Sequence, residues 1–249
     1  MKPSQGYLET MAADLYKSIY DDLLKHRDKK KIVADSRYHK YDGYNSFGIK
    51  SAVRKEIFRK YRKEIKQLSC REVLVLAKKL AARRIEDATL AGNFVLQNRP
   101  ECPNKDILPS LDKYLNNFRS WSTTDDFCIN VLQPTLMKNP KETLHLLGKW
   151  NRSKNMWKRR ASVVVFVRKI GQGGRFTNEA LKLCNGLIWD KEDLVQKGVG
   201  WCLKDVMRGD KKKVLAYVEA LRKKGVPAVI TLYAIRGIKG PERSRILAV

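Results

Sequence analysis

Histidine and cysteine are scarce in this chain, and neither is grouped in a way that suggests a metal site. The three histidines, His26, His39 and His145, lie far apart in the sequence and are expected to be surface or helix-capping residues. The cysteines include no Cys-x-x-Cys pair, which argues against a zinc site and a disulfide framework. We therefore expect no metal and no cofactor. We predict reduced, mostly buried thiols at Cys70, Cys102, Cys128, Cys184 and Cys202.

Long apolar runs are also missing. No segment approaches the ~18 consecutive apolar residues of a membrane span, and no amphipathic anchor stands apart from the rest of the chain. The first seven residues lack the charged and then apolar build of a signal peptide. These absences predict a cytoplasmic protein without a membrane partner.

Acidic residues are few relative to basic ones. The chain has 52 Lys and Arg but only 26 Asp and Glu, a formal net charge of +26 on 249 residues. Such an excess goes far beyond what solubility requires and predicts a polyanionic partner, DNA or RNA. No pattern of a known RNA-binding module occurs, which favours DNA over RNA.

Apolar residues recur at helical spacing along nearly the whole chain, for example Leu15, Ile19 and Leu23. The run 163–167, Val-Val-Val-Phe-Val, is the one strand-like exception. We assign it to a buried helix because Asn155 is a suitable N-cap and the amphipathic pattern continues to Ile170. The sequence therefore predicts an all-α protein.

Short turns and caps punctuate these helices. Asp190 with Asp193 resembles a capping box, Asp210 can cap the helix after it, and Pro227 suits the first turn of the last helix. The longest non-helical connection, 98–110, contains three prolines, but neither side of it looks self-sufficient. We therefore predict a single domain, 1–249.

Helices joined by short turns stack as antiparallel pairs. Pairs of about 40 residues suit a divergent HEAT-like solenoid, an α–α superhelix whose extended concave surface would be basic in this chain. A compact helical bundle is the alternative architecture.

Trp201 lies on one helical stripe with Lys197, Lys204 and Arg208. Cations suit phosphates and an indole suits a sugar or a base, so this stripe predicts contact with nucleic acid. A second basic stripe is expected within residues 55–66. One charged stripe is usually only the solvated face of its helix, but several with little matching acid repel themselves unless phosphates neutralise them.

Trp121 and Asp125 are spaced i and i+4, which places an indole and a carboxylate side by side on one helix face. A carboxylate that faced DNA would repel phosphate, so Asp125 there would need a chemical task. The alternative is structural: Ser122, Thr123 or Asp125 caps a helix, and Trp121 anchors it in the core.

Trp157 is followed by three basic residues, Lys158, Arg159 and Arg160, at the start of the buried helix. A packed scaffold would hold such cations near its surface, and Arg160 is the best fixed of the three because it directly precedes the apolar run. A phosphate contact and an ion pair within the protein are both open for Arg160.

Three segments together resemble the AlkD-like family of DNA alkylation repair glycosylases. They are the Trp-x-x-x-Asp of residues 121–125, the Asn-x-Trp-x-Arg-Arg-Ala of 155–161 and the Gln-Lys-Gly-Val-Gly-Trp of 196–201. The resemblance covers most of the chain and implies a superhelix of HEAT-like repeats that removes cationic N3- or N7-alkylated purines. Carried over by position, Asp125 would be the catalytic carboxylate, Trp121 and Trp201 aromatic walls around the damaged nucleotide, and Arg160 a backbone contact.

The implied chemistry fits a chain poor in histidine. A cationic purine leaves as a neutral base, so cleavage of its glycosidic bond needs no general acid. The developing oxocarbenium sugar instead needs a countercharge, which Asp125 would supply while orienting the attacking water. We therefore predict a monomeric, monofunctional alkylpurine DNA glycosylase acting on duplex DNA. The DNA-binding set would be Trp157, Lys158, Arg159, Arg160, Lys197, Lys204 and Arg208.

Two departures from the family pattern concern DNA affinity more than cleavage. After Trp201 the family often continues Leu-Arg-Glu, whereas here Lys204 and Asp205 follow Leu203, so a bidentate guanidinium becomes a point charge. Ala52 and Val53 stand where a proline-containing turn is common. The rival hypothesis is a non-catalytic scaffold that binds damaged or branched DNA, in which Asp125 is structural.

Overall fold

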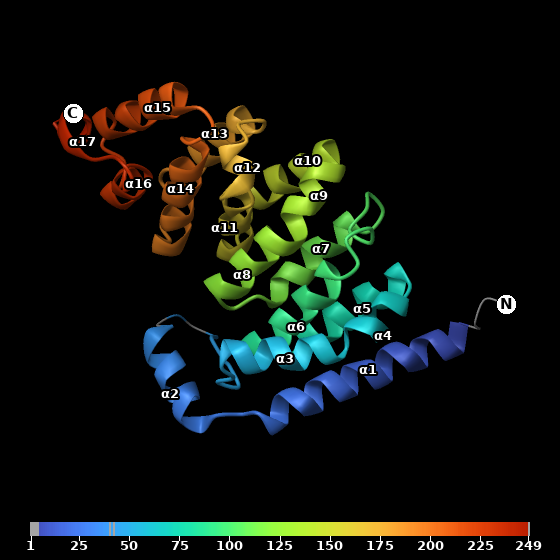
Figure 1. The fold of residues 1–249 in the computed structure, drawn as a ribbon. Helices are drawn as coiled ribbons and strands as arrows, with labels where there is room; N and C mark the ends of the chain where they lie inside the picture. The colour runs from blue at the N-terminus through green and yellow to red at the C-terminus, as the bar shows by residue number, and fades with distance from the viewer. Residues whose placement is uncertain (1–4, 40, 42, 249) are drawn as a thin grey trace. The chain divides into compact units, whose positions relative to one another are not determined.

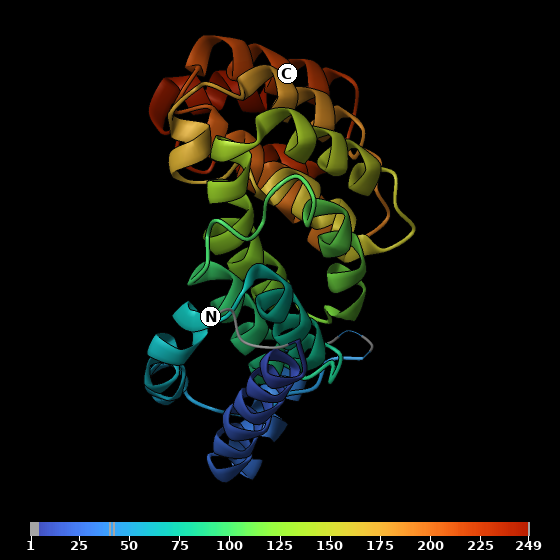
Figure 2. The same ribbon diagram turned by 90° about the vertical axis from the view of Figure 1, so that its right-hand side faces the viewer.

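The computed structural model describes residues 5–39, 41 and 43–248, and all regular secondary structure in this part of the chain is helical (Figure 1). No strand arrow appears in the view turned by 90° either (Figure 2). The predicted all-α class is therefore confirmed. None of the described helices is both long and apolar enough to cross a bilayer. Residues 1–4, part of the segment judged unlike a signal peptide, lie outside the described residues.

The chain divides into two compact units, Met1–Asn139 and Pro140–Val249. The predicted boundary candidate, 98–110, is not the dividing point, because it lies inside the first unit. The elements of the first unit are α1 (Gln5–Lys25), α2 (Lys29–Tyr38), α3 (Ser51–Lys60), α4 (Arg62–Gln67), α5 (Cys70–Ala81), α6 (Glu86–Gln97), α7 (Leu108–Tyr114), the 3-10 turn η1 (Leu115–Asn117), α8 (Trp121–Phe127), the π-helical turn η2 (Cys128–Leu132) and α9 (Gln133–Lys138). Those of the second unit are α10 (Pro140–Asn151), α11 (Met156–Val164), α12 (Lys169–Gln172), α13 (Thr177–Asn185), α14 (Asp193–Val206), α15 (Lys211–Lys223), α16 (Ala228–Ala234) and α17 (Gly240–Leu247).

In the first unit, helix α5 packs on both α1 and α6, and α6 packs on α8. The core includes three rings, Tyr114, Phe118 and Phe127, whose centroids lie 5.1–5.5 Å apart and which are fully buried. Offset and edge-on ring packing of this kind adds to the free energy gained by burying the apolar area. This core supports the underside of α8.

In the second unit, α11 packs on both α10 and α14, and α14 packs on α16. Asn155 caps α11 as predicted, because its side chain accepts a hydrogen bond from the Trp157 amide at 2.9 Å. The run 163–167 is buried, as predicted, but α11 ends at Val164 and a turn separates it from α12, so no single helix continues to Ile170. Consecutive helices also pack on each other, α5 on α6 and α10 on α11, as expected of the helix pairs in a helical-repeat protein.

Three cap and helix predictions have mixed outcomes. Asp210 caps α15 as predicted, by accepting from the Lys213 amide at 3.1 Å. The capping box at Asp190 and Asp193 is wrong: Asp193 is the first residue of α14, and the carboxylate of Asp190 instead binds Arg159. Pro227 precedes α16, but α17 follows as a further helix.

One cysteine prediction needs correction. Cys70, the first residue of α5, forms a disulfide with Cys102, which lies just after α6, and their Cα atoms are 4.9 Å apart. Helices α5 and α6 pack as a hairpin, so the start of one lies near the end of the other, a proximity that cysteine spacing alone does not reveal. Free and buried thiols are confirmed for the other three, Cys128, Cys184 and Cys202.

Candidate active site

Helix α8 carries the predicted tryptophan and aspartate side by side. The helix begins at Trp121 because the hydroxyl of Ser120 accepts from the Thr123 amide at 3.1 Å, so the cap is Ser120 and not one of the three residues considered from the sequence. The i, i+4 spacing within the helix confirms that Trp121 and Asp125 share a face. Trp121 is half-buried, and Asp125 is 8% exposed. Local structure therefore pairs an indole with a nearly buried carboxylate.

An aromatic cluster formed by Tyr38, His39, Tyr41, Tyr44 and Trp121 surrounds the indole. The His39 ring lies 5.6 Å from the Trp121 ring and stacks on Tyr44 at 4.1 Å, and Tyr38 meets Trp121 edge-on at 6.4 Å. Of the two positions expected for His39, surface or helix cap, the second is confirmed, because His39 is the C-cap residue of α2 and only 8% of it is exposed. Burial lowers the pKa of the His39 imidazole, against the opposing pull of two nearby carboxylates, so the ring favours its neutral form.

A buried hydrogen-bond network joins α8 to α6. The amide of Asn93 donates to the Thr123 carbonyl at 3.0 Å and to Asp126 at 2.9 Å, and it accepts from the Tyr114 hydroxyl at 2.8 Å. Burial is the main reason that the pKa of Asp126 is raised; hydrogen bonds from two amides oppose the shift and the charge of Asp125 adds to it. The network fixes the helix that carries the candidate site, and the sequence analysis missed it.

The loop before α3 is also anchored from the interior. Asp87, which is 1% exposed, accepts from the Phe47 amide and from the Arg54 guanidinium, each at 2.8 Å. Helix α3 begins at Ser51 without a side-chain cap. The start of α3 is therefore well defined although Ala52 and Val53 depart from the family pattern, because Asp87 binds one residue before this point and one after it.

In the second unit, α14 presents Trp201 with a fixed ring. The indole Nε1 donates to Asp205 at 2.8 Å, and the same carboxylate accepts from the Arg168 amide at 2.8 Å and lies 3.4 Å from the Lys204 ammonium. Gly200 lets α14 approach α16, since a Cβ there would lie 2.6 Å from the Cβ of Tyr233. The half-buried indole is therefore oriented by the aspartate four residues after it.

The basic stripe predicted on α14 is partly satisfied within the unit. Lys197 pairs with Asp193 at 2.6 Å, and the Lys204 ammonium lies 5.7 Å from the centre of the Tyr233 ring. Arg208 is exposed in the turn after the helix. Together with four further charged residues it borders a pocket of about 470 Å³, whose charged lining is Lys204, Arg208, Lys211, Lys239 and Glu242. Four cations against one carboxylate make this pocket attractive to phosphate.

The residues at the start of α11 that are predicted to contact DNA are more deeply buried than the sequence suggested. Trp157, Lys158 and Arg160 are each only 5–6% exposed, and Arg160 donates to the Leu194 carbonyl at the start of α14. Arg159 makes a two-bond pair with Asp190 and donates to two backbone carbonyls. This geometry favours the structural alternative for Arg159, and the DNA contacts of all four residues stay predictions.

Comparison with known proteins identifies the family. The sequence pattern of the DNA alkylation repair enzymes matches residues 19–238. No curated protein matches the sequence significantly. Two solved structures share the fold. A predicted DNA alkylation repair enzyme from Enterococcus faecalis has a TM-score of 0.71 at 12% identity, over 86% of this chain and 97% of that one. The alkylpurine DNA glycosylase AlkC of Pseudomonas fluorescens, bound to DNA with an abasic site analogue, has a TM-score of 0.55 at 14% identity, over 96% of this chain and 65% of that one.

Among the described residues, no group of three or more His, Cys, Asp or Glu is arranged to hold a metal ion. The matched region includes both tryptophans, Asp125 and the helices that hold them. The chain therefore belongs to the DNA alkylation repair enzyme family.

Proposed function

We propose that this protein is an alkylpurine DNA glycosylase that hydrolyses the glycosidic bond of N3- and N7-alkylated, cationic purines in duplex DNA. Membership of the repair family and the fold shared with an alkylpurine glycosylase support this reaction class. The observation that carries the proposal is the Trp121 and Asp125 pair on a helix fixed by the Asn93 network. A rigid helix is needed because electrostatic catalysis works only when the charge is held in place before the reaction.

Asp125 acts on the sugar rather than on the base. Its carboxylate stabilises the positive charge that develops on the deoxyribose as the glycosidic bond lengthens, and it orients the attacking water. Its low exposure strengthens this interaction, since few water molecules screen the charge. The departing purine already carries the positive charge that a general acid would otherwise supply, so bond cleavage yields a neutral base.

Trp121 and Trp201 contact the damaged nucleotide. Each is half-buried and held by neighbours, so little ordering is needed when DNA binds. Cation–π attraction to an alkylated base contributes ~0.5 to 2 kcal/mol for each ring. The DNA backbone is bound by Arg160 and by the cations of α14 and its following turn, Lys197, Lys204 and Arg208. The protein acts as a monomer on double-stranded DNA.

A base-release assay tests this function. Purified protein is incubated with methylated duplex DNA, and free 7-methylguanine and 3-methyladenine are quantified by chromatography. The proposal predicts time-dependent release of both bases and none from unmethylated DNA. Tight binding to the methylated duplex without any release would overturn it in favour of a non-catalytic DNA-binding scaffold.

A further inference from the structure

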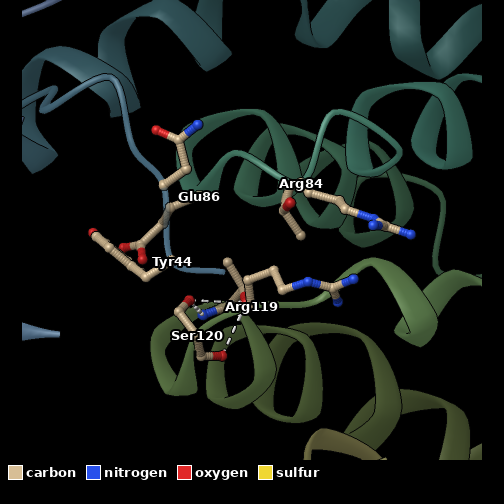
Figure 3. A pocket seen from close by; sticks show the side chains of 8 residues that line it. Tyr44, Arg84, Glu86, Arg119 and Ser120 are labelled. Atoms are coloured by element: carbon tan, nitrogen blue, oxygen red, sulfur yellow. Dashed lines mark hydrogen bonds between the residues drawn. The ribbon is translucent and has the colours of Figure 1, made fainter. Parts of the chain in front are cut away.

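Two arginines lie side by side on the first unit, outside the residues assigned so far. Arg84 follows α5 and Arg119 precedes α8, and both border a narrow pocket (Figure 3). Their guanidinium groups point in the same direction, away from Glu86 and Tyr44 on the other side of the pocket (Figure 3). Two parallel cations repel each other unless an anion lies between or in front of them.

Arg119 is fixed by its surroundings. Its guanidinium donates to the carbonyls of Asn116 at 2.9 Å and Phe118 at 2.6 Å. Its aliphatic stem passes close to Gly43, where a Cβ would lie 3.1 Å from the arginine Cδ. Burial, and then the charge of Arg84, lower the pKa of Arg119. The group is thus held in place although its surroundings disfavour its charge.

Arg84 adopts a backbone conformation that suits glycine. Its φ is +54°, one of two positive values among the described residues other than glycine, and a left-handed arginine is less stable than glycine at the same place. Its side chain is exposed and makes no ion pair with any described acidic residue. Fold stability alone therefore does not account for an arginine here.

We propose that Arg84 and Arg119 together bind one phosphate group of the DNA backbone. A phosphodiester offers two anionic oxygens to two planar donor groups and removes the repulsion between them. The inference rests on the proposed function, because the duplex is the ligand. It adds a contact on the first unit, two residues before Trp121, to the cations of the second unit.

The test uses Arg84→Gly, which removes the charge and relieves the backbone, with Lys105→Ala as the matched control. Lys105 is an exposed cation on the same unit and makes no ion pair with the described acidic residues. We expect Arg84→Gly to raise Tm by about 2–4 °C and to weaken duplex binding about tenfold at low salt. Because Arg119 still contacts the same phosphate, the slope of log affinity against log salt should fall in magnitude by no more than about 0.9, the share of one phosphate. Lys105→Ala should change the affinity much less.

A double variant tests whether both arginines contact the same phosphate or each contacts a separate one. Arg84→Gly with Arg119→Gln should lower the salt slope by about 0.9 in total, whereas two separate phosphates would lower it by about 1.8. A duplex with a neutral methylphosphonate at the contacted position should bind wild-type protein more weakly, and the double variant should not distinguish it from unmodified DNA. Equal affinities of wild type and Arg84→Gly, or losses that match Lys105→Ala, would overturn the inference.

Two further measurements, the Tm in inorganic phosphate and base release, separate the phosphate contact from the proposed glycosylase activity. If inorganic phosphate at matched ionic strength raises the Tm of wild type but not of Arg84→Gly, while duplex affinities are equal, the pair binds a free anion and the backbone assignment is wrong. Base release is measured on the same proteins. Wild type that binds DNA through the arginine pair but releases no base would overturn the glycosylase and leave the phosphate contact standing.

Discussion

Each unit carries a tryptophan with an aspartate four residues later on the same helix, and the two pairs are held differently. On α14, Asp205 accepts from the Trp201 indole and the Arg168 amide and pairs with the Lys204 ammonium at 3.4 Å, and only 3% of it is exposed. On α8, the Trp121 indole packs against Tyr38, the last residue of α2, and against His39, which follows it, and Asp125 is 8% exposed. The same spacing therefore occurs with a buried aspartate that orients its indole in one unit and with the proposed catalytic aspartate in the other.

The spacing of the two residues determines their shared helix face, and the surrounding elements determine whether the aspartate orients the indole. An i, i+4 spacing places two side chains on one face. Whether the carboxylate then orients the indole depends on donors from other elements, such as the Arg168 amide, which is 37 residues away. Substitutions at either pair therefore test whether the two aspartates have different roles.

The largest expected effect concerns the charge of the substrate. A neutral alkylated base such as O6-methylguanine would leave as an anion unless it were protonated, and the proposed site supplies no general acid. General acid catalysis contributes about 10²–10⁴ in rate, so release of the neutral base should be slower than release of 7-methylguanine by at least that factor. The two rates are compared in single-turnover assays on otherwise identical duplexes. Comparable rates would mean that the site protonates its leaving group.

The next effect concerns the indole of the second unit. Trp201→Ala should slow 7-methylguanine release by about 2- to 30-fold, the equivalent of ~0.5 to 2 kcal/mol of cation–π attraction. Trp189→Ala is the matched control, because Trp189 lies on the same unit, is 57% exposed and has no place in the proposed site. Similar losses in both variants would point to a general effect on the unit rather than contact with the lesion.

A smaller effect tests the structural role of Asp205 directly. Asp205→Ala leaves the Trp201 and Arg168 N–H groups without their acceptor, which should lower the free energy of unfolding by about 1–3 kcal/mol. Asp193→Ala, on the same helix but 62% exposed in its side chain, should change it by less than about 0.5 kcal/mol. Denaturant titration of both variants measures the difference. A stability unchanged by Asp205→Ala would contradict the structural assignment.

The smallest effect is a pH dependence from His39 beside Trp121. Burial holds its folded-state pKa below the ordinary value of 6.5, so the unfolded chain binds more protons as the pH falls. The stability contributed by neutral His39 should be complete above about pH 6.5 and decline as the pH falls toward the folded-state pKa. The Tm of wild type, measured from pH 8 to 5, should fall more steeply than that of His39→Gln. Parallel profiles would show that His39 does not carry this dependence.

Features set by local sequence were predictable. The all-helical class, the caps at Asn155 and Asp210, the burial of residues 163–167 and the shared face of Trp121 and Asp125 all follow from side chains within a few residues of one another. The family was also recognisable, because its three segments are short and local. The narrower AlkD-like assignment stays a prediction.

Features that depend on distant segments were not predictable. The Cys70–Cys102 disulfide requires the hairpin of α5 and α6, and the Arg159–Asp190 pair joins residues 31 positions apart. The Asn93 network likewise needs α6 to pack on α8. The hydrogen bond from Trp201 to Asp205 could have been predicted, since its i, i+4 spacing is visible in the sequence and matches that of Trp121 and Asp125.

The most direct measurement of the central claim is single-turnover release of 7-methylguanine by wild type and Asp125→Asn. The protein must saturate the duplex, and dissociation constants are measured alongside. If the carboxylate stabilises the sugar cation, Asp125→Asn should release the base about 10²–10³ times more slowly while binding the duplex as tightly as wild type. Equal release rates for the two proteins would contradict the account.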